Sequence, residues 1–480
     1  MNCATRVLPH VRDRPDHPAI WTVSDGRVTF GDFGRLTGAA QSLARDEGLG
    51  IGDAVLVLSR PDPLLFATIV GLLGLGITVV FVEPWLPVRA IGHVLDRVRP
   101  KAFIGTRLAQ LWALRVPAAR RIPNWIHIDR ISRGGASPTF ECIDLDPDST
   151  ATITFSSGTT GRPKGVVRSH ACMWSLHEAI TEGDRLDHFE EPALCVFPNL
   201  ALLHLGTGRG AVLVPKKWSA RGLADVLALS GPLGTASLVT GPAFLIELLR
   251  FAEGRDVLSS LRSITVGGAQ TDCWILERGF ERWPDARWTH VYGGSEAEPV
   301  AKADAREAVR RSRERDRFQT LFLGGPVPAV DADPDPAGLW VSGSNVALRL
   351  DDDPGVPSAG TRYDERGQRW HNMGDRIVAD ADGWWYDGRA DRPAGEFELE
   401  QRIYTDLGTS AGFVHRLSDG RLMLYGDEMT RRVAQAGPRF LSRYPEIDGV
   451  GNARIVRDRR HRARIDRQRT LVKSGHRGGP

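Results

Sequence analysis

Strand-like and helical segments alternate along the first part of the chain, and this order limits the folds that it can adopt. The runs AVLVLSR (54–60), TVVFVEP (78–84) and KAFIGT (101–106) are short, apolar and rich in β-branched residues, which is typical of buried strands. The segment VRAIGHVLDRV (88–98) lies between two of them and has helical spacing. Strands separated by helices favour a parallel sheet with helices on both faces. The chain is therefore predicted to be an α/β protein with parallel or mixed sheets.

An uncharged stretch from Leu64 to Val82 is nearly long enough to span a bilayer. Gly71, Gly74 and Gly76 interrupt it, and its end is rich in β-branched residues. A buried helix that leads into a buried strand accounts for the same residues, so no membrane span is expected. Five scattered cysteines without a CxxC pair, and a first segment without an apolar core, favour a cytoplasmic protein with reduced thiols.

The chain of 480 residues is long enough for two or three domains. From about residue 325 to residue 390, short strand-like runs alternate with Gly, Pro and Asp clusters, which indicates a small β-rich module. We predict a large N-terminal domain over residues 1–390 that includes this module. A short α+β C-terminal domain is predicted over residues 391–480.

The end of the chain, residues 454–480, is basic, with ten Arg or Lys residues against two Asp. A solvated tail and a surface for a polyanion both fit this composition. No aromatic residues are interleaved with the charges, so nucleic acid as a partner is not favoured. The net charge of the whole chain, +3, is also too small to argue for nucleic acid.

The segment TFSSGTTGRPKG, residues 154–165, follows an apolar run and combines glycines, hydroxyl side chains and a lysine. Glycines allow turns in which several backbone N–H groups converge on an anion, and the side chains add further donors. A flexible surface linker has a similar composition, but linkers rarely contain Pro-Lys-Gly between two apolar strands. We therefore predict a polyphosphate-binding loop made of Ser156, Ser157, Gly158, Thr159, Thr160, Gly161 and Lys164.

This loop closely resembles the phosphate loop of the adenylate-forming superfamily, which includes acyl-CoA synthetases, nonribosomal-peptide adenylation domains and luciferases. Other segments that resemble its motifs occur in the expected order: DGRVTFGDFGRL (25–36), LGIGDAVLVL (49–58), VYGGSEAEP (291–299), GLWVSG (338–343) and HNMGDRIVADADGWWYDGRADR (371–392). The resemblance extends over roughly residues 15 to 467. It implies an ATP- and Mg²⁺-dependent ligase that activates a carboxylic acid as an acyl adenylate.

The resemblance also implies roles for individual residues near the nucleotide. Tyr292 and Gly293 would lie against adenine, and Glu296 would hold the Mg²⁺ that screens the phosphates. Asp375 would accept hydrogen bonds from both ribose hydroxyl groups. Arg389 would bind near the ribose and the phosphate.

The acid pocket of the superfamily lies between segments that correspond here to PNLALLHLG (198–206) and VGGAQ (266–270). His204 matches a histidine that closes on the acyl chain, and a hydrogen-bonded core histidine explains the same residue equally well. Room beside the adenylate is left by three small residues, Gly267, Gly268 and Ala269.

The C-terminal pattern differs from that of relatives that make thioesters. Asp391 matches the hinge about which the C-terminal domain rotates, but the segment that follows it lacks the usual lysine and two glycines that help to admit a thiol. The ending DRRHRARIDRQR (458–469) and the segment YGGSEAEPV (292–300) instead resemble the β-lactone synthetases of olefin pathways. The superfamily's catalytic lysine falls at Arg464, which keeps the charge with a different geometry, unless Lys473 takes its place.

From the sequence alone, three functions stay open. The first is an AMP-forming ligase that closes a β-hydroxy acid to a β-lactone, with Lys164, His204, Glu296 and Arg464 as catalytic residues. The second is an acyl or aryl acid ligase that passes its adenylate to CoA, a carrier protein or an amine. The third is a degenerate member that binds nucleotide without turnover, which Arg464 in place of lysine suggests.

Overall fold

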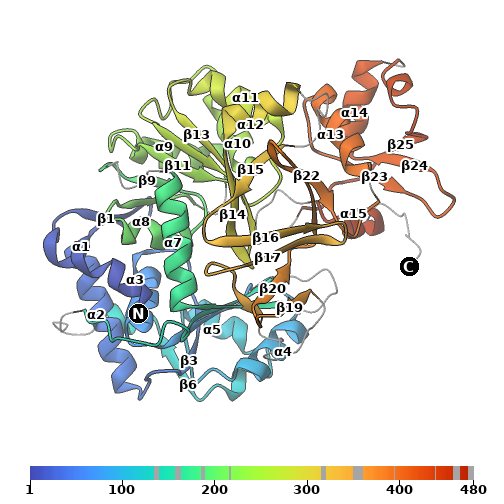
Figure 1. Ribbon diagram of the computed structural model, residues 1–480. Helices are drawn as coiled ribbons and strands as arrows, with labels where there is room; N and C mark the ends of the chain where they lie inside the picture. Colours follow the sequence, from blue (N-terminus) through green and yellow to red (C-terminus); the bar gives the residue numbers. More distant parts are fainter. Residues whose placement is uncertain are drawn as a thin grey trace.

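The computed structural model describes residues 1–133, 140–156, 164–184, 190–215, 218–314, 321–349, 360–393, 395–437, 439–457 and 465–473. Two large sheets covered by helices are followed by a small sheet and by a C-terminal group of helices and strands (Figure 1). The predicted α/β class with mixed sheets is confirmed.

The seven-stranded sheet has the order β18-β8-β7-β4-β3-β5-β6. Its strands are β3 (Ala54–Leu58), β4 (Thr78–Phe81), β5 (Ala102–Gly105), β6 (Asn124–His127), β7 (Thr150–Ser156), β8 (Lys164–Ser169) and β18 (Leu348–Arg349). The five strands from β7 to β6 are parallel, β8 is antiparallel to β7, and β18 is antiparallel to β8.

Helices cover both faces of this sheet. Val55 and Val57 of β3 belong to a core that includes α2 (Phe30–Asp46) and α3 (Pro63–Gly74). Leu56, which points to the other face, belongs to a second core that includes α4 (Val88–Val98) and α5 (Arg107–Ala113). Parallel strands that are buried on both faces explain why the strand segments are apolar without alternation.

The uncharged stretch that resembles a membrane span is α3 followed by β4. Asp62 starts the helix, because its carboxylate accepts a hydrogen bond from the backbone N–H of Leu65 at 2.8 Å. The helix is buried all round between α2 and the sheet. No helix in the described part of the chain combines the length and the apolar character that a bilayer crossing requires.

The eleven-stranded sheet has the order β2-β1-β10-β9-β11-β12-β13-β14-β15-β22-β21. Its strands are β1 (Pro18–Thr22), β2 (Gly26–Thr29), β9 (Ala193–Cys195), β10 (Ala211–Leu213), β11 (Ser237–Thr240), β12 (Ser263–Val266), β13 (Arg287–Gly294), β14 (Ala297–Asp304), β15 (Phe322–Pro326), β21 (Asp375–Asp380) and β22 (Gly383–Arg389). The strands from β1 to β13 in this order are parallel, and β14, β15, β22 and β21 extend the sheet in antiparallel fashion.

Helices also pack against this second sheet. They are α7 (His170–Asp184), α8 (Leu200–Gly206), α9 (Ala220–Ser230), α10 (Pro242–Ala252), α11 (Cys273–Arg282) and α12 (Ala305–Glu314). Trp288 of β13 and Trp385 of β22 are among the largest side chains that are fully enclosed in the core there.

The range predicted as a β-rich module contributes to three sheets, because its short strand β18 belongs to the seven-stranded sheet. Four strands form a sheet of their own: β16 (Val330–Asp335), β17 (Gly338–Gly343), β19 (Thr361–Tyr363) and β20 (Arg369–Asn372). In contrast, β22 pairs with β15, with Trp385 opposite Phe322, and thereby joins the large sheet. The division of the chain at residue 391 stays a prediction.

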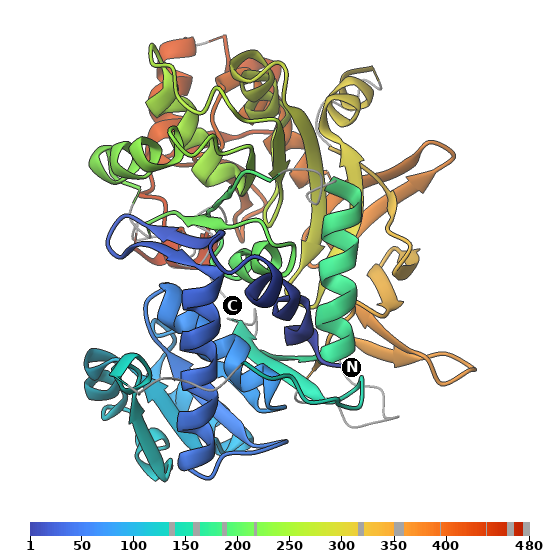
Figure 2. The same cartoon turned by 90° about the vertical axis from the view of Figure 1, so that its left-hand side faces the viewer.

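The last elements are three strands, which form a separate sheet, and three helices; these elements have an apolar core of their own. They are α13 (Glu396–Leu407), β23 (Phe413–Arg416), β24 (Leu422–Tyr425), α14 (Asp427–Ala436), β25 (Gly449–Gly451) and α15 (Arg467–Lys473). In both views, α13 and α14 lie at the opposite end of the molecule from α4 and α5 (Figures 1 and 2).

Four buried histidines make the stability of the fold depend on pH. Burial lowers the pKa of His170, His177 and His290 to about 4 and that of His204 to about 3, from an ordinary value of 6.5. In this pH range the unfolded chain protonates these histidines and the folded chain does not. The free energy of unfolding should therefore fall as the pH drops from about 6.5 to about 4. Each histidine contributes about 1.4 kcal/mol per pH unit.

Urea unfolding at several pH values measures this loss. Asp272 has the opposite effect on stability. Burial raises the pKa of its carboxyl to about 6, so at this residue the folded chain binds a proton before the unfolded chain does. His170→Gln should reduce the slope, and His93→Gln, at an exposed position, should leave it unchanged. An unfolding free energy that does not change between pH 6.5 and pH 5 would contradict the assignment.

Candidate active site

The candidate site lies at the edge of the large sheet where the parallel strands end. In open α/β sheets the carboxyl ends of parallel strands are the usual place for ligands. Gly267 and Gly268 directly follow β12, and Tyr292 and Gly293 close β13. The backbone N–H of Gly267 donates to Thr240 O at 3.0 Å, which ties the end of β12 to the end of β11.

Tyr292, from the segment 291–299, lies together with Asp375 and Arg389, from the segment 371–392. The Tyr292 hydroxyl donates to Oδ2 of Asp375 at 2.8 Å, and Nη1 of Arg389 donates to Oδ1 at 3.0 Å. Asp375 and Arg389 also face each other in the register of β21 and β22. Their binding roles stay predictions, but the pairing of distant motifs is a property of the fold.

Burial and charge keep the protons of Tyr292 and Arg389 in place, so that both groups can donate hydrogen bonds to Asp375. Burial, reinforced by the Asp375 carboxylate, raises the pKa of Tyr292 well above its ordinary range, so its hydroxyl remains a donor. Burial works against the charge of Arg389, but the Asp375 carboxylate raises the pKa of that guanidinium overall. Asp375 itself is only 8% exposed. The site therefore holds a carboxylate among fixed donors.

Tyr386 is a fourth member of this group that the sequence analysis missed. Its hydroxyl donates to Oδ1 of Asp375 at 3.3 Å, and its ring packs edge-on against Phe397 of α13 with centroids 5.1 Å apart. The only signal in the sequence is an aromatic residue shortly before the Gly-Arg pair in YDGR. Tyr386 thus connects the carboxylate to the first helix of the C-terminal elements.

The turn between β13 and β14 carries Glu296. A Cβ at Gly293 would lie 2.8 Å from the carbonyl oxygen of Ala297, so only glycine fits this tight turn without a shift. The carbonyl of Glu296 accepts from the N–H of Ala347 at 2.7 Å. The Glu296 side chain itself is partly exposed at the site.

Arg168 is a second residue that the sequence analysis missed, and it joins this turn to the phosphate-loop hairpin. From β8, its guanidinium donates to Oγ1 of Thr154 on β7 at 3.2 Å and to the carbonyl oxygen of Ser295. Ser295 directly precedes Glu296. The only signal in the sequence is a charged residue in the strand KGVVRS.

The phosphate-loop hairpin is described at its base. Ser156 and Lys164 are paired at the ends of β7 and β8, so the chain leaves and re-enters the sheet at adjacent positions. The predicted loop residues between them lie outside the described residues: Ser157, Gly158, Thr159, Thr160 and Gly161. Arg464 also lies outside them.

The two segments predicted to border the acid pocket meet at Phe197. A Cβ at Gly268 would lie 3.5 Å from the Phe197 ring, and one at Gly241 would lie 3.0 Å from it. Phe197 belongs to an apolar cluster that includes Leu200 and Leu203 of α8. The sequence analysis did not single out Phe197, which directly precedes the predicted segment. Ala269 follows Gly268 in the same chain segment.

His204 lies on α8, and its side chain is fully buried. Burial, with smaller contributions from Arg209 and His177, lowers its pKa to about 3, so its ring is neutral. Neither ring nitrogen forms a hydrogen bond within the described residues. The role of His204 at the acid and the alternative of a core histidine therefore both stay predictions.

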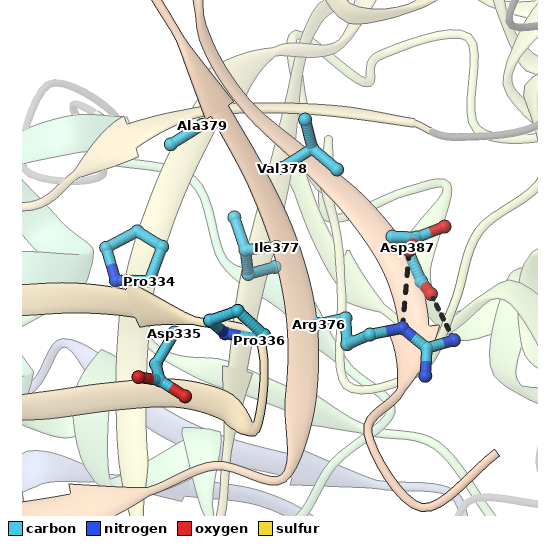
Figure 3. Close-up of a pocket in the computed structure, with 8 residues that line it drawn as sticks. All are labelled: Pro334, Asp335, Pro336, Arg376, Ile377, Val378, Ala379 and Asp387. Atoms are coloured by element: carbon cyan, nitrogen blue, oxygen red, sulfur yellow. Dashed lines mark hydrogen bonds and ion pairs between the residues drawn. The ribbon is translucent and has the colours of Figure 1, made fainter. Parts of the chain in front are cut away.

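Asp391 lies in an exposed turn between β22 and α13, and the side chain of Arg376 holds the backbone that follows it. Nη1 of Arg376, on β21, donates to the carbonyl oxygen of Arg392 at 2.6 Å. The same guanidinium pairs with Asp387 at 3.3 Å, at the rim of a hollow of about 310 Å³ beside the β16–β17 turn (Figure 3).

Glu400 of α13 connects this turn to the end of the chain. Its carboxylate, 3% exposed, pairs with Arg392 at 3.1 Å and with Arg467 of α15 at 2.8 Å, and it accepts from the N–H of Val414 at 2.8 Å. Arg467 is three positions after Arg464. One buried carboxylate therefore anchors both the residue after Asp391 and the helix after Arg464.

Comparisons with known proteins agree with this architecture. The sequence signature described as AMP-binding enzyme matches residues 9–347. The olefin beta-lactone synthetase of Xanthomonas campestris pv. campestris is 28% identical in an alignment of 491 positions, gaps included, that covers 94% of this chain and 82% of that protein. The olefin beta-lactone synthetase of Stenotrophomonas maltophilia is 28% identical over 335 residues, or 64% of this chain and 60% of that protein.

Solved structures share the fold. The anthranilate CoA ligase AuaEII in complex with anthranoyl-AMP has a TM-score of 0.79 at 16% identity, with 99% of this chain and 97% of that chain covered. The o-succinylbenzoate CoA synthetase MenE from Bacillus subtilis has a TM-score of 0.76 at 17% identity, with 95% and 96% covered.

The tight turn before Glu296 can be tested by a matched pair of substitutions. Gly293→Ala should lower the free energy of unfolding by about 1–3 kcal/mol, because its methyl group would collide with the backbone. Gly325→Ala has open space around its Cβ and should change it by less than about 0.5 kcal/mol. Urea unfolding measures both, and equal values would contradict the close approach at Gly293.

Proposed function

We propose that this chain, which belongs to the AMP-binding enzyme family, activates a β-hydroxy acid with ATP and closes it to a β-lactone. The chain is an enzyme, an AMP-forming ligase. The β-hydroxy acid and the ring closure are the parts that we propose. The observation that carries them is the similarity to an olefin beta-lactone synthetase along 94% of this chain.

A second observation supports transfer within the substrate. Only four residues separate Asp391 from α13, which starts at Glu396. Arg376 and Glu400 hold the backbone and the side chain of Arg392 in this short connection. A ligase that transfers its acyl group to the substrate's own hydroxyl needs no path for an external thiol, so a short and tethered connection is compatible with it.

The residues at the sheet edge suit a nucleotide. Tyr292 and Gly293 would bind adenine, and Asp375 and Arg389 would bind the ribose and the phosphate. Asp375 already accepts hydrogen bonds from Tyr292, Tyr386 and Arg389. With four acceptor positions on a carboxylate, it can take one ribose hydroxyl without rearrangement. A second hydroxyl would displace one of the two phenols.

Glu296 fits a site for Mg²⁺. No cluster of three or more ligating side chains is found among the described residues, and Mg²⁺ in nucleotide sites needs only one or two carboxylates besides phosphate oxygens. Glu296 is partly exposed and its backbone is held by Ala347 and, through Ser295, by Arg168. When bound, Mg²⁺ would screen the charge of the triphosphate.

The remaining residues would act on the acid and the phosphates. Lys164 and the loop that starts at Ser156 would bind the triphosphate, and Arg464 would bridge the carboxylate and the α-phosphate. Phe197, Gly268 and the neutral His204 would border the acyl chain. A neutral imidazole can accept or donate one hydrogen bond to the substrate without adding a buried charge.

The proposed reaction has two balanced steps. A carboxylate oxygen attacks the α-phosphorus, and the bond to pyrophosphate breaks. The β-hydroxyl oxygen then attacks the acyl carbon, its proton passes to the solvent, and the bond between the acyl carbon and the phosphate oxygen breaks, which releases AMP. Because both reacting groups belong to one molecule, the second step gains a large proximity advantage.

Mass spectrometry of the organic product tests the proposal. We expect purified protein with ATP, Mg²⁺ and 3-hydroxy acids, without CoA, to yield a product one water lighter than the acid and an equal amount of AMP. A product that forms only when CoA, a carrier protein or an amine is added would support an external acceptor instead. If no AMP forms in either experiment, the result would favour binding without turnover. Arg464→Lys is the variant that should then restore activity.

Asp375→Asn tests the nucleotide site. The variant keeps the shape of the side chain but loses the charge that strengthens its hydrogen bonds, so ATP binding should weaken by about tenfold. Isothermal titration calorimetry measures this, with Asp285→Asn as the control at an exposed position. Unchanged affinity in a folded Asp375→Asn variant would contradict the assignment.

A further inference from the structure

The outer surface of α4 and α5 is unusually basic. Between Pro84 and Pro123 the chain contains seven Arg and one Lys against a single acidic residue, Asp96. Both helices pack on the same face of the seven-stranded sheet, and an ion pair between Arg121 and Asp96 joins α4 to the segment after α5. Their outward residues therefore form one surface, which we name the basic face.

At least half of these basic residues form no ion pair within the described part of the chain. Lys101 pairs with Asp53 at 2.8 Å, and Arg121 pairs with Asp96. Four further side chains are exposed and form no ion pair within the described residues: Arg89, Arg99, Arg107 and Arg115. Unpaired arginines on one surface attract an anionic partner.

Three leucines project from the same surface. Leu108, Leu111 and Leu114 are 76%, 65% and 46% exposed, although their neighbours Ala113 and Val116 are buried. A spacing of three residues places them along one side of α5. Singly exposed leucines are common, but a row of three flanked by Arg107 and Arg115 combines apolar and cationic groups in one patch.

We propose that the basic face binds the surface of a bilayer that contains anionic lipids. The leucines would enter the boundary between headgroups and acyl chains, and the flanking arginines would bind lipid phosphates, as interfacial helices do. Leu108 and Leu111 on this seven-residue helix, with Leu114 directly after it, cover less area than the ~800 Å² per partner of a specific protein interface. A bilayer needs no matching shape, so shallow insertion is sufficient.

The location of the face is compatible with docking of the folded enzyme. α4 and α5 lie at the opposite end of the molecule from α13 and α14 (Figures 1 and 2). A bilayer at this end would not cover the C-terminal elements. This inference does not depend on the identity of the acid, so its failure would leave the proposed lactone closure untouched.

Co-sedimentation with sucrose-loaded vesicles tests the proposal on the full chain. Vesicles of phosphatidylcholine with about one third phosphatidylglycerol should bind the protein at least tenfold more tightly than phosphatidylcholine alone. Higher salt should weaken this binding because the arginines and phosphates are exposed. Equal affinity for the two kinds of vesicle would overturn the proposal.

Three double variants separate the contributions. Arg107→Glu with Arg115→Glu should reduce binding to the anionic vesicles by at least about tenfold. Leu108→Gln with Leu111→Gln should also reduce it severalfold, because less apolar area is buried. Arg27→Glu with Arg221→Glu changes the net charge equally at exposed positions elsewhere and should retain most of the binding.

Other results would assign the face differently. If the leucine variant bound vesicles as tightly as the wild type, the binding would result from non-specific electrostatic attraction alone, and the proposal would fail. If light scattering showed a wild-type dimer that the leucine variant loses, while no vesicles were bound, the face would be an interface between two copies. Because all these side chains are exposed, thermal unfolding should confirm that the variants are folded.

Discussion

The buried carboxylate of Asp375 is the interaction on which the arrangement of the active site depends. It accepts hydrogen bonds from Tyr292 on β13 and from Tyr386 and Arg389 on β22. β13 and β21 are not neighbours in the sheet, so side chains rather than backbone pairing connect them here. A buried carboxylate without such partners would cost several kcal/mol, and this cost selects the packing in which the donors converge on it.

The antiparallel extension of the sheet makes this convergence possible. Strands β14 and β15 follow the parallel strands and give β22 and β21 a surface on which to pair. Asp375 and Arg389, fourteen positions apart in sequence, become direct neighbours through that register. A site made of rigid strands holds its polar groups more precisely than a site made of loops.

Two sets of contacts made by arginine side chains connect the phosphate-loop hairpin and the end of the chain to this framework. Arg168 ties the base of the phosphate-loop hairpin to the turn that carries Glu296. Glu400 ties Arg392, next to the hinge position Asp391, to Arg467 at the start of α15. In both cases an arginine binds across elements with several donors, for which a lysine would offer fewer directed hydrogen bonds.

The sequence by itself determined the α/β class, the helix and strand within residues 64–82, and the motifs that later meet at Tyr292, Asp375 and Arg389. The class and the helix and strand follow from local spacing and composition, which act over a few residues, whereas the motifs were identified by their resemblance to the adenylate-forming superfamily. Only the tertiary structure decided that Tyr386, Arg168, Phe197 and Arg467 belong beside them. Their partners lie on other strands and helices, and no local pattern encodes which distant side chain a buried charge or ring will meet.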